Sequence, residues 1–134
     1  MHFNPRVFTL EEATALLPRL REILDEMQKA REQLVERHAH LTEQHHGGRG
    51  NGVAKAGSEL DRLNAQIQDA ETSIQAAARA IADLGCELKD PDRGMVDFRT
   101  VRDGRVVYLC WLKHEPDIAF WHELEGGYAG RQPL

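Results

Sequence analysis

The side chains with the most chemical capacity lie in the last third of this 134-residue chain. The candidate ligand-binding residues are Asp97, Glu115, His122, Glu123 and Arg131. Carboxylates and imidazole are ligands for hard or borderline metal ions, so Glu115, His122 and Glu123 form a candidate site for a divalent metal. Their spacing matches no established metal motif. Taken singly, each also has a structural interpretation, as a turn residue, a hydrogen-bonded strand residue or an arginine partner.

Cys110 is a second candidate for chemistry. A catalytic thiol needs a base within hydrogen-bond reach, and His122 on a neighbouring strand could supply it. The apolar neighbours Leu109 and Trp111 favour a packed thiol instead. The other cysteine, Cys86, is far away in the sequence and forms no CxxC pair with it. Two reduced, packed thiols are therefore the expectation.

Other groups of polar residues have simpler interpretations. A metal pair on one helix face needs a spacing of three or four residues, which none of the central histidines has. These are His38, His40, His45 and His46. The arginines around the expected β-turn either form an anion patch or act as edge-strand charges that limit aggregation. They are Arg93, Arg99, Arg102 and Arg105.

Three functions are compatible with these residues. The first is a self-associating binding or regulatory module with a small ligand or metal site. The second is a metal-assisted hydrolase or acid–base enzyme that uses Asp97, Glu115, His122 and Glu123. The third is a structural adaptor without a site. The residues do not decide whether the protein is an enzyme.

The composition of the chain argues against two classes of partner, nucleic acids and membranes. The net charge of −5 and pI near 5.8 argue against general nucleic-acid binding. No apolar run approaches the roughly 20 residues that span a bilayer, so no membrane association is expected. The start, MHFNPRVF, lacks the features of a signal peptide. A cytoplasmic, single-domain protein is the expectation.

The elements that must position these residues begin with a helix. Thr9 and Glu12 have the spacing of a capping box. Pro18 falls inside the apolar pattern that follows, where it removes a backbone hydrogen bond to Thr14 and should kink or break the helix. The residues before the proline, from Leu10 to Leu17, should pack on the β-region.

Beyond this proline the apolar residues recur at alternating intervals of three and four, and they do so again over residues 60–84. This is the heptad period of coiled coils. Glycines at 47–52 should end the first helix, Ser58 resembles a start signal, and Gly85 suits a helix end. The chain is therefore expected to form a long antiparallel helical hairpin over residues 9–85. A homodimer through this hairpin is plausible because two helices leave each other half exposed.

Residues 86–134 are expected to form a three-stranded antiparallel β-meander and a glycine-rich tail, which makes the fold class α+β. Asp103-Gly104 suits a two-residue type I′ turn. That turn fixes the register of the first two strands. The facing pairs are Val101 with Val106, Arg99 with Tyr108, Asp97 with Cys110, and Val96 with Trp111.

One face of these strands is expected to be core. It carries Val96, Phe98, Thr100, Val107, Leu109 and Trp111. The third strand should cover Ile118 to Glu123. The turn before it, Lys113 to Asp117, is not a two-residue hairpin, so the face that His122 takes is left open.

Four segments carry a resemblance to a known family: RVFTLEEATALLPRLREI, GMVDF, GRVVYLCW and IAFWHELEGGYAGRQPL. Together they resemble the uncharacterised prokaryotic family called domain of unknown function 2203. The chain departs from the family pattern at His114 and Arg99, so the resemblance implies no role for either. It brings no established activity. The family-typical positions that it implies are Asp97, Trp111, Glu115, Trp121, His122, Glu123, Gly130 and Arg131.

Overall fold

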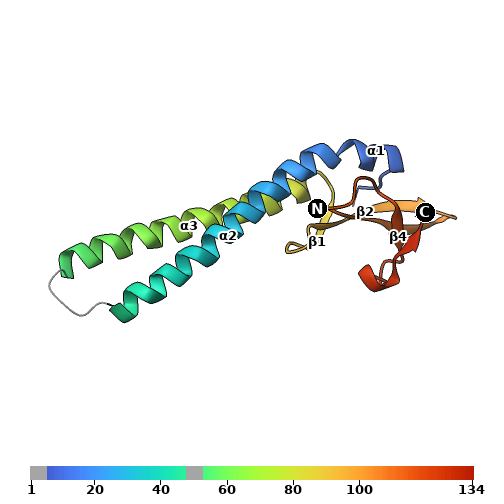
Figure 1. The fold of residues 1–134 in the computed structure, drawn as a ribbon. Coiled ribbons are helices and arrows are strands. Elements are labelled where there is room, and N and C mark those ends of the chain that lie inside the picture. Colours follow the sequence, from blue (N-terminus) through green and yellow to red (C-terminus); the bar gives the residue numbers. More distant parts are fainter. Residues whose placement is uncertain (1–5, 48–52) are drawn as a thin grey trace. The chain divides into compact units, whose positions relative to one another are not determined.

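The computed structural model describes residues 6–47 and 53–134, without the side chains of 44–47 and 53–56. Its internal contacts divide the chain into two units, residues 26–77 and the remainder. Figure 1 shows two long helices followed by a sheet, which confirms the predicted α+β class. No helix in the described part of the chain is long and apolar enough to cross a membrane.

The first helix, α1 (Leu10–Ala15), starts with the predicted capping box. The Glu12 amide donates to Thr9 Oγ1 over 3.1 Å, and the Thr9 amide donates to Glu12 Oε1 over 2.9 Å. The helix ends at Ala15 with Leu16 as its C-cap, and α2 (Leu17–Gly47) begins at the next residue. Pro18 is the second residue of α2, where a missing amide proton costs little. The predicted break near Pro18 is confirmed.

The unit of residues 26–77 consists of the paired parts of α2 and α3 (Val53–Asp83), which run antiparallel (Figure 1). The helical hairpin is therefore confirmed. α3 begins before the start signal at Ser58. The side chains of His45 and His46 are not described, and residues 48–52, which hold most of the glycine segment, lie outside the described residues. The buried apolar residues of the unit 26–77 are Met27, Ala30, Leu63, Ile67, Ala70 and Ala77.

The end of α3 is set by Gly85, which has a φ of +91°. Its amide donates to the Ala82 carbonyl over 2.9 Å, and the Cys86 amide donates to the Ile81 carbonyl over 3.4 Å. This pair of hydrogen bonds is a Schellman motif, which favours glycine because only glycine adopts positive φ without strain. The chain thereby leaves the helix and enters the sheet.

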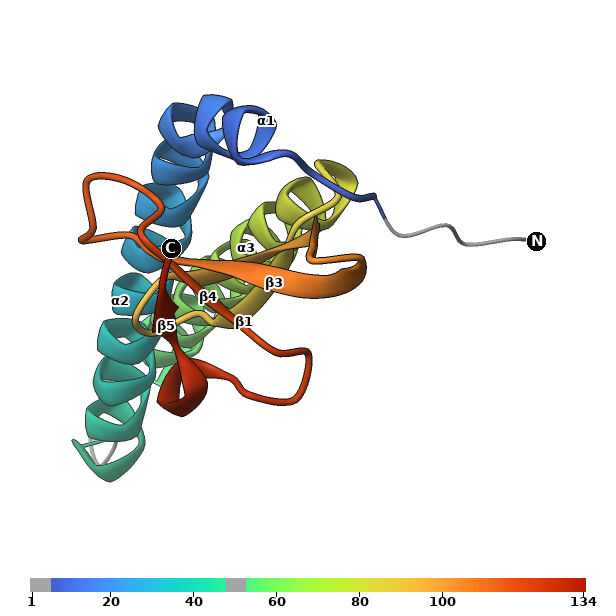
Figure 2. The same cartoon turned by 90° about the vertical axis from the view of Figure 1, so that its right-hand side faces the viewer.

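The sheet has five antiparallel strands in sequence order, so it is a meander (Figure 2). Its strands are β1 (Glu87–Asp90), β2 (Met95–Arg102), β3 (Arg105–Leu112), β4 (Phe120–His122) and β5 (Gln132–Pro133). The predicted count of three strands was wrong, because β1 and β5 add one strand at each edge. Both are too short to show an alternating pattern, and β5 includes a proline.

The turn between β2 and β3 has positive φ at both central residues, +53° at Asp103 and +79° at Gly104. This is the type I′ geometry that suits the twist of a hairpin. All four predicted pairs are present, including Asp97 with Cys110. The two turn residues therefore predicted the register of all eight facing pairs of β2 and β3.

One face of the sheet is the expected core, with Val96, Phe98, Val107, Leu109 and Trp111 at most 3% exposed. Phe8, just before α1, contacts this face. The Phe8 ring meets the Phe98 ring edge-on at 5.4 Å, and the Phe8 amide donates to the Arg99 carbonyl over 2.7 Å. The guanidinium of Arg21 lies 5.3 Å from the Trp111 ring.

Candidate metal centre

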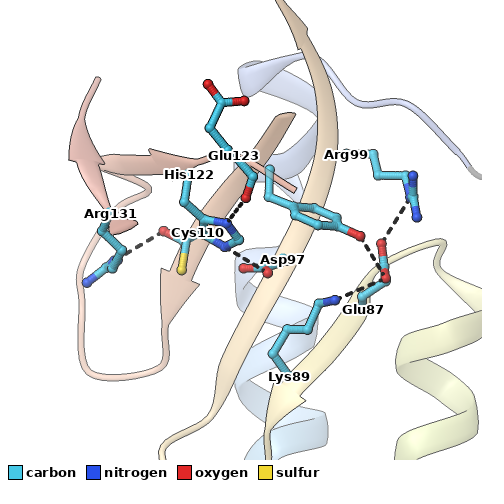
Figure 3. Close-up of polar contacts among 9 residues, drawn as sticks. Glu87, Lys89, Asp97, Arg99, Cys110, His122, Glu123 and Arg131 are labelled. Atoms are coloured by element: carbon cyan, nitrogen blue, oxygen red, sulfur yellow. Dashed lines mark hydrogen bonds and ion pairs between the residues drawn. The ribbon is translucent and has the colours of Figure 1, made fainter. Parts of the chain in front are cut away.

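The register of β3 and β4 decides the open question about His122. His122 lies opposite Tyr108, and Asp97 lies opposite Cys110. Residues directly opposite each other in an antiparallel pair share a face, and alternate residues of a strand share it too. His122 therefore joins Asp97, Tyr108 and Cys110 on the face opposite Phe98 and Trp111, a face that is also buried. Figure 3 shows His122, Asp97 and Cys110 close together.

Asp97, Cys110 and His122 form one buried cluster. A carboxylate oxygen, the sulfur and a ring nitrogen all lie within 4.8 Å of one another. The three residues are 1%, 0% and 1% exposed. Their ligand types, O, S and N, suit zinc and similar borderline ions. Among the residues that the structure describes, this is the one group of three or more such side chains.

Two hydrogen bonds orient the imidazole of His122. Nδ1 lies 2.6 Å from the Glu123 carbonyl oxygen, and Nε2 lies 2.9 Å from Asp97 Oδ2. A carbonyl only accepts, so Nδ1 must carry a proton. The second contact also needs a proton, either on Nε2 or on the carboxyl group. Asp97 and His122 therefore share one proton, and the pair is neutral overall in both arrangements.

The carboxyl group of Asp97 is in an environment that disfavours its charge. Burial raises the pKa of Asp97, and the partly opposing effect of His122 does not cancel this. Its second oxygen, Oδ1, is buried and has no hydrogen-bond partner among the described residues. A buried acceptor of this kind costs about 1–3 kcal/mol, and a ligand that bonded to this oxygen would remove that cost.

The Cys110 thiol is strongly held in its protonated form. Burial raises the pKa of Cys110 to about 12, and the charge of Asp97 adds to the effect, whereas Arg131 opposes it. A thiol of this kind is a poor nucleophile at neutral pH, because the thiolate is the reactive form. The arrangement therefore disfavours the catalytic thiol that the sequence left open.

Glu115 and Arg131 form a separate clamp beside the cluster. The guanidinium of Arg131 donates to Glu115 Oε1 over 2.6 Å and to the Cys110 carbonyl over 3.2 Å. The Leu112 amide donates to the same Glu115 oxygen over 2.7 Å. Both side chains are nearly buried, at 11% and 13% exposure. The clamp fixes the C-terminal tail against β3.

Glu123 contributes to the site through its backbone. Its carboxylate pairs with Arg105 at the surface and is about half exposed, at 47%. The predicted ligands Glu115, His122 and Glu123 are therefore held by different partners, and only His122 belongs to the described metal cluster. Cys110, which the sequence favoured as a packed thiol, takes a place in it. The register set by Asp103-Gly104 pairs Cys110 with Asp97, and this pairing was the sequence signal for the role of Cys110 in the cluster.

A polar network from the unpredicted strand β1 lies next to the cluster (Figure 3). Glu87 accepts from the Tyr108 hydroxyl over 3.0 Å and from Arg99 Nε over 3.1 Å, and it pairs with Lys89 at 3.4 Å. Burial raises the pKa of Glu87, but the Tyr108 hydrogen bond and the two cations outweigh it and leave the pKa below its usual range. The Tyr108 ring, 5.4 Å from the His122 ring, joins this network to the cluster.

Comparison with other proteins places the chain in a family. No curated protein and no solved structure matches the chain. A family model described as an uncharacterized conserved protein, DUF2203, matches residues 6–134. The match includes α1, α2, α3, the sheet and all three residues of the cluster. The chain therefore belongs to the DUF2203 family, as its four segments predicted.

Proposed function

We propose that this protein is a metal-binding module whose site is Asp97, Cys110 and His122, and that it takes a borderline divalent ion, zinc first. The observation that carries the proposal is the convergence of three different ligand atoms within 4.8 Å at buried positions. They come from three adjacent strands, so the sheet itself sets their spacing.

The orientation of His122 supports this function. A histidine that binds metal through one ring nitrogen commonly donates the other N–H to a carbonyl or carboxylate. Here Nδ1 donates to the Glu123 carbonyl, and Nε2 points at Asp97. A metal ion would replace the shared proton between Nε2 and the carboxylate. Asp97 Oδ1 gives the ion a further oxygen.

The charges also balance when an ion replaces protons. Binding would release the proton shared by Asp97 and His122 and the proton of the Cys110 thiol. One divalent ion then replaces two protons, so the charge of the buried cluster does not change. Arg131 is already neutralised by Glu115. Because the pKa of Cys110 is raised to about 12, the affinity should increase with pH.

The burial of the cluster favours a binding module over a hydrolase. A substrate must reach the metal at an open coordination position, and each of the three ligand side chains is at most 2% exposed. The carboxylates of Glu115 and Glu123, which the enzyme hypothesis would also use, are engaged with arginines. Three protein ligands leave one position of a tetrahedral ion for a small molecule such as water.

Cobalt(II) is a spectroscopic probe for the proposed site, because a thiolate ligand gives it a charge-transfer absorption. The wild type titrated with cobalt(II) should gain this absorption in proportion to one ion per chain. Cys110→Ser should lose it. Cys86→Ser is the matched control, since Cys86 is also buried but lies outside the cluster.

Two results would overturn the proposal. One is a wild type that shows no thiolate–cobalt absorption under conditions that keep cysteines reduced. The other is a Cys110→Ser variant that keeps the absorption while Cys86→Ser loses it. Circular dichroism of each variant would show that the helices and sheet are retained.

A further inference from the structure

A hollow of about 550 Å³ lies on the other face of the sheet from the metal cluster. Its floor includes Leu109 and Trp121, which alternate along β3 and β4 with Cys110 and His122. Phe8 and Leu10 form part of the wall. The volume is in the range of small-molecule sites, which are mostly apolar with a few placed polar groups.

The sheet side of the hollow carries a cation and a hydroxyl. Thr100 and Arg102 are two residues apart on β2, so their side chains project to the same face. The Arg102 guanidinium lies over the Trp121 ring at 4.7 Å. Within the described ranges, no carboxylate pairs with Arg102 and no group hydrogen-bonds the hydroxyl of Thr100, although Thr100 is only 9% exposed.

The lining of the hollow also includes an acidic side chain. Glu12 lines the hollow, and one of its oxygens accepts from the Thr9 amide in the capping box. The pKa of Glu12 is lowered by its hydrogen bonds to Thr9, so the carboxylate is ionised at neutral pH. Glu12 and Arg102 form no ion pair with each other in the described structure. The charged side chains that line the hollow are therefore one acid, Glu12, and one base, Arg102, beside the apolar residues of its floor.

We propose that this hollow binds a free α-amino acid with a large apolar side chain. The carboxylate of the ligand would meet the Arg102 guanidinium and the Thr100 hydroxyl, and its ammonium group would meet Glu12. The side chain would pack on Trp121 and Leu109. Charge-assisted hydrogen bonds and an apolar floor together distinguish this ligand from simple anions and from hydrocarbons. The proposal uses none of the metal ligands and does not depend on the metal site.

Isothermal titration calorimetry with three probes tests the assignment. L-Phenylalanine carries both charges, 3-phenylpropanoate lacks the ammonium group, and 2-phenylethylamine lacks the carboxylate. L-Phenylalanine should bind, and each analogue should bind on the order of tenfold more weakly, because loss of a charged hydrogen bond costs about one tenfold step or more.

Arg102→Gln should weaken L-phenylalanine binding on the order of tenfold. Arg19→Gln is the control, because Arg19 is an exposed arginine that pairs with Glu22 and does not line the hollow. Thr100→Val, which keeps the side-chain shape, is a second variant if Arg102→Gln does not fold. The proposal is overturned if L-phenylalanine does not bind, if either analogue binds as tightly, or if the folded variant binds like the wild type.

Discussion

At the scale of single residues, the protein holds a proton where it could hold a metal ion. Asp97 and His122 are both buried, and His122 Nε2 and Asp97 Oδ2 are hydrogen-bonded to each other. A buried pair need not stabilise a fold more than apolar residues would, but removing one partner leaves the other uncompensated. The stability of the metal-free protein should therefore be sensitive to the loss of either side chain of the pair.

Asp97→Ala should lower the free energy of unfolding of the metal-free protein by about 3–5 kcal/mol, since His122 Nε2 loses its buried partner. Urea denaturation followed by circular dichroism measures this. Glu123→Ala, which removes an exposed carboxylate paired with Arg105, should have a clearly smaller effect. Equal losses of unfolding free energy in the two variants would show that the buried Asp97–His122 pair stabilises the fold no more than the exposed pair does.

At the scale of elements, local sequence signals with a direct physical cause were sufficient to predict where helices break and how two strands pair. The capping box at Thr9, the break near Pro18 and the type I′ turn were all predicted from one to four residues. The turn then fixed which residues of β2 and β3 face each other. The heptad spacing likewise predicted the two paired helices, because burial of one stripe requires that period.

The sequence could not supply what depends on tertiary contacts. β1 is a charged four-residue strand and β5 has two residues, so neither has a pattern of its own. The sheet face on which His122 lies depends on the turn before β4, and the irregular length of that turn left the face open in the sequence. Residue type alone suggested that Glu115 and Glu123 join His122 as ligands. In the structure, the Glu115 carboxylate pairs with Arg131 and the Glu123 carboxylate pairs with Arg105. Cys110 was passed over because its neighbours are apolar.

Two glycines with positive φ give a matched test of the strand connections. Gly104→Ala should cost about 1–2 kcal/mol, because the added Cβ meets nothing within 4 Å and only the left-handed backbone is strained. Gly94→Ala should cost more, since its Cβ would also lie 2.8 Å from Lys113 Cβ. Thermal unfolding of both variants measures the difference. A smaller loss for Gly94→Ala would contradict the close approach of the turn before β2 to Lys113, which follows β3.

At the scale of the whole molecule, the expected homodimer through the helical hairpin stays a prediction. α2 has a largely polar outer surface, on which Val35 is 71% exposed. A single exposed valine does not define an interface. The paired helices bury their apolar stripe mainly as alanine, leucine and isoleucine within residues 26–77. The mass of the protein in solution would settle this expectation together with the metal content.

Native mass spectrometry of the zinc-treated protein tests the central claim most directly, because one spectrum gives the number of ions, the protons lost and the number of chains. The wild type should gain one zinc per chain with the loss of two protons, and a double variant with Cys110→Ser and His122→Asn should gain none. Retention of the same zinc by the double variant, or a wild type that binds no zinc, would contradict the account.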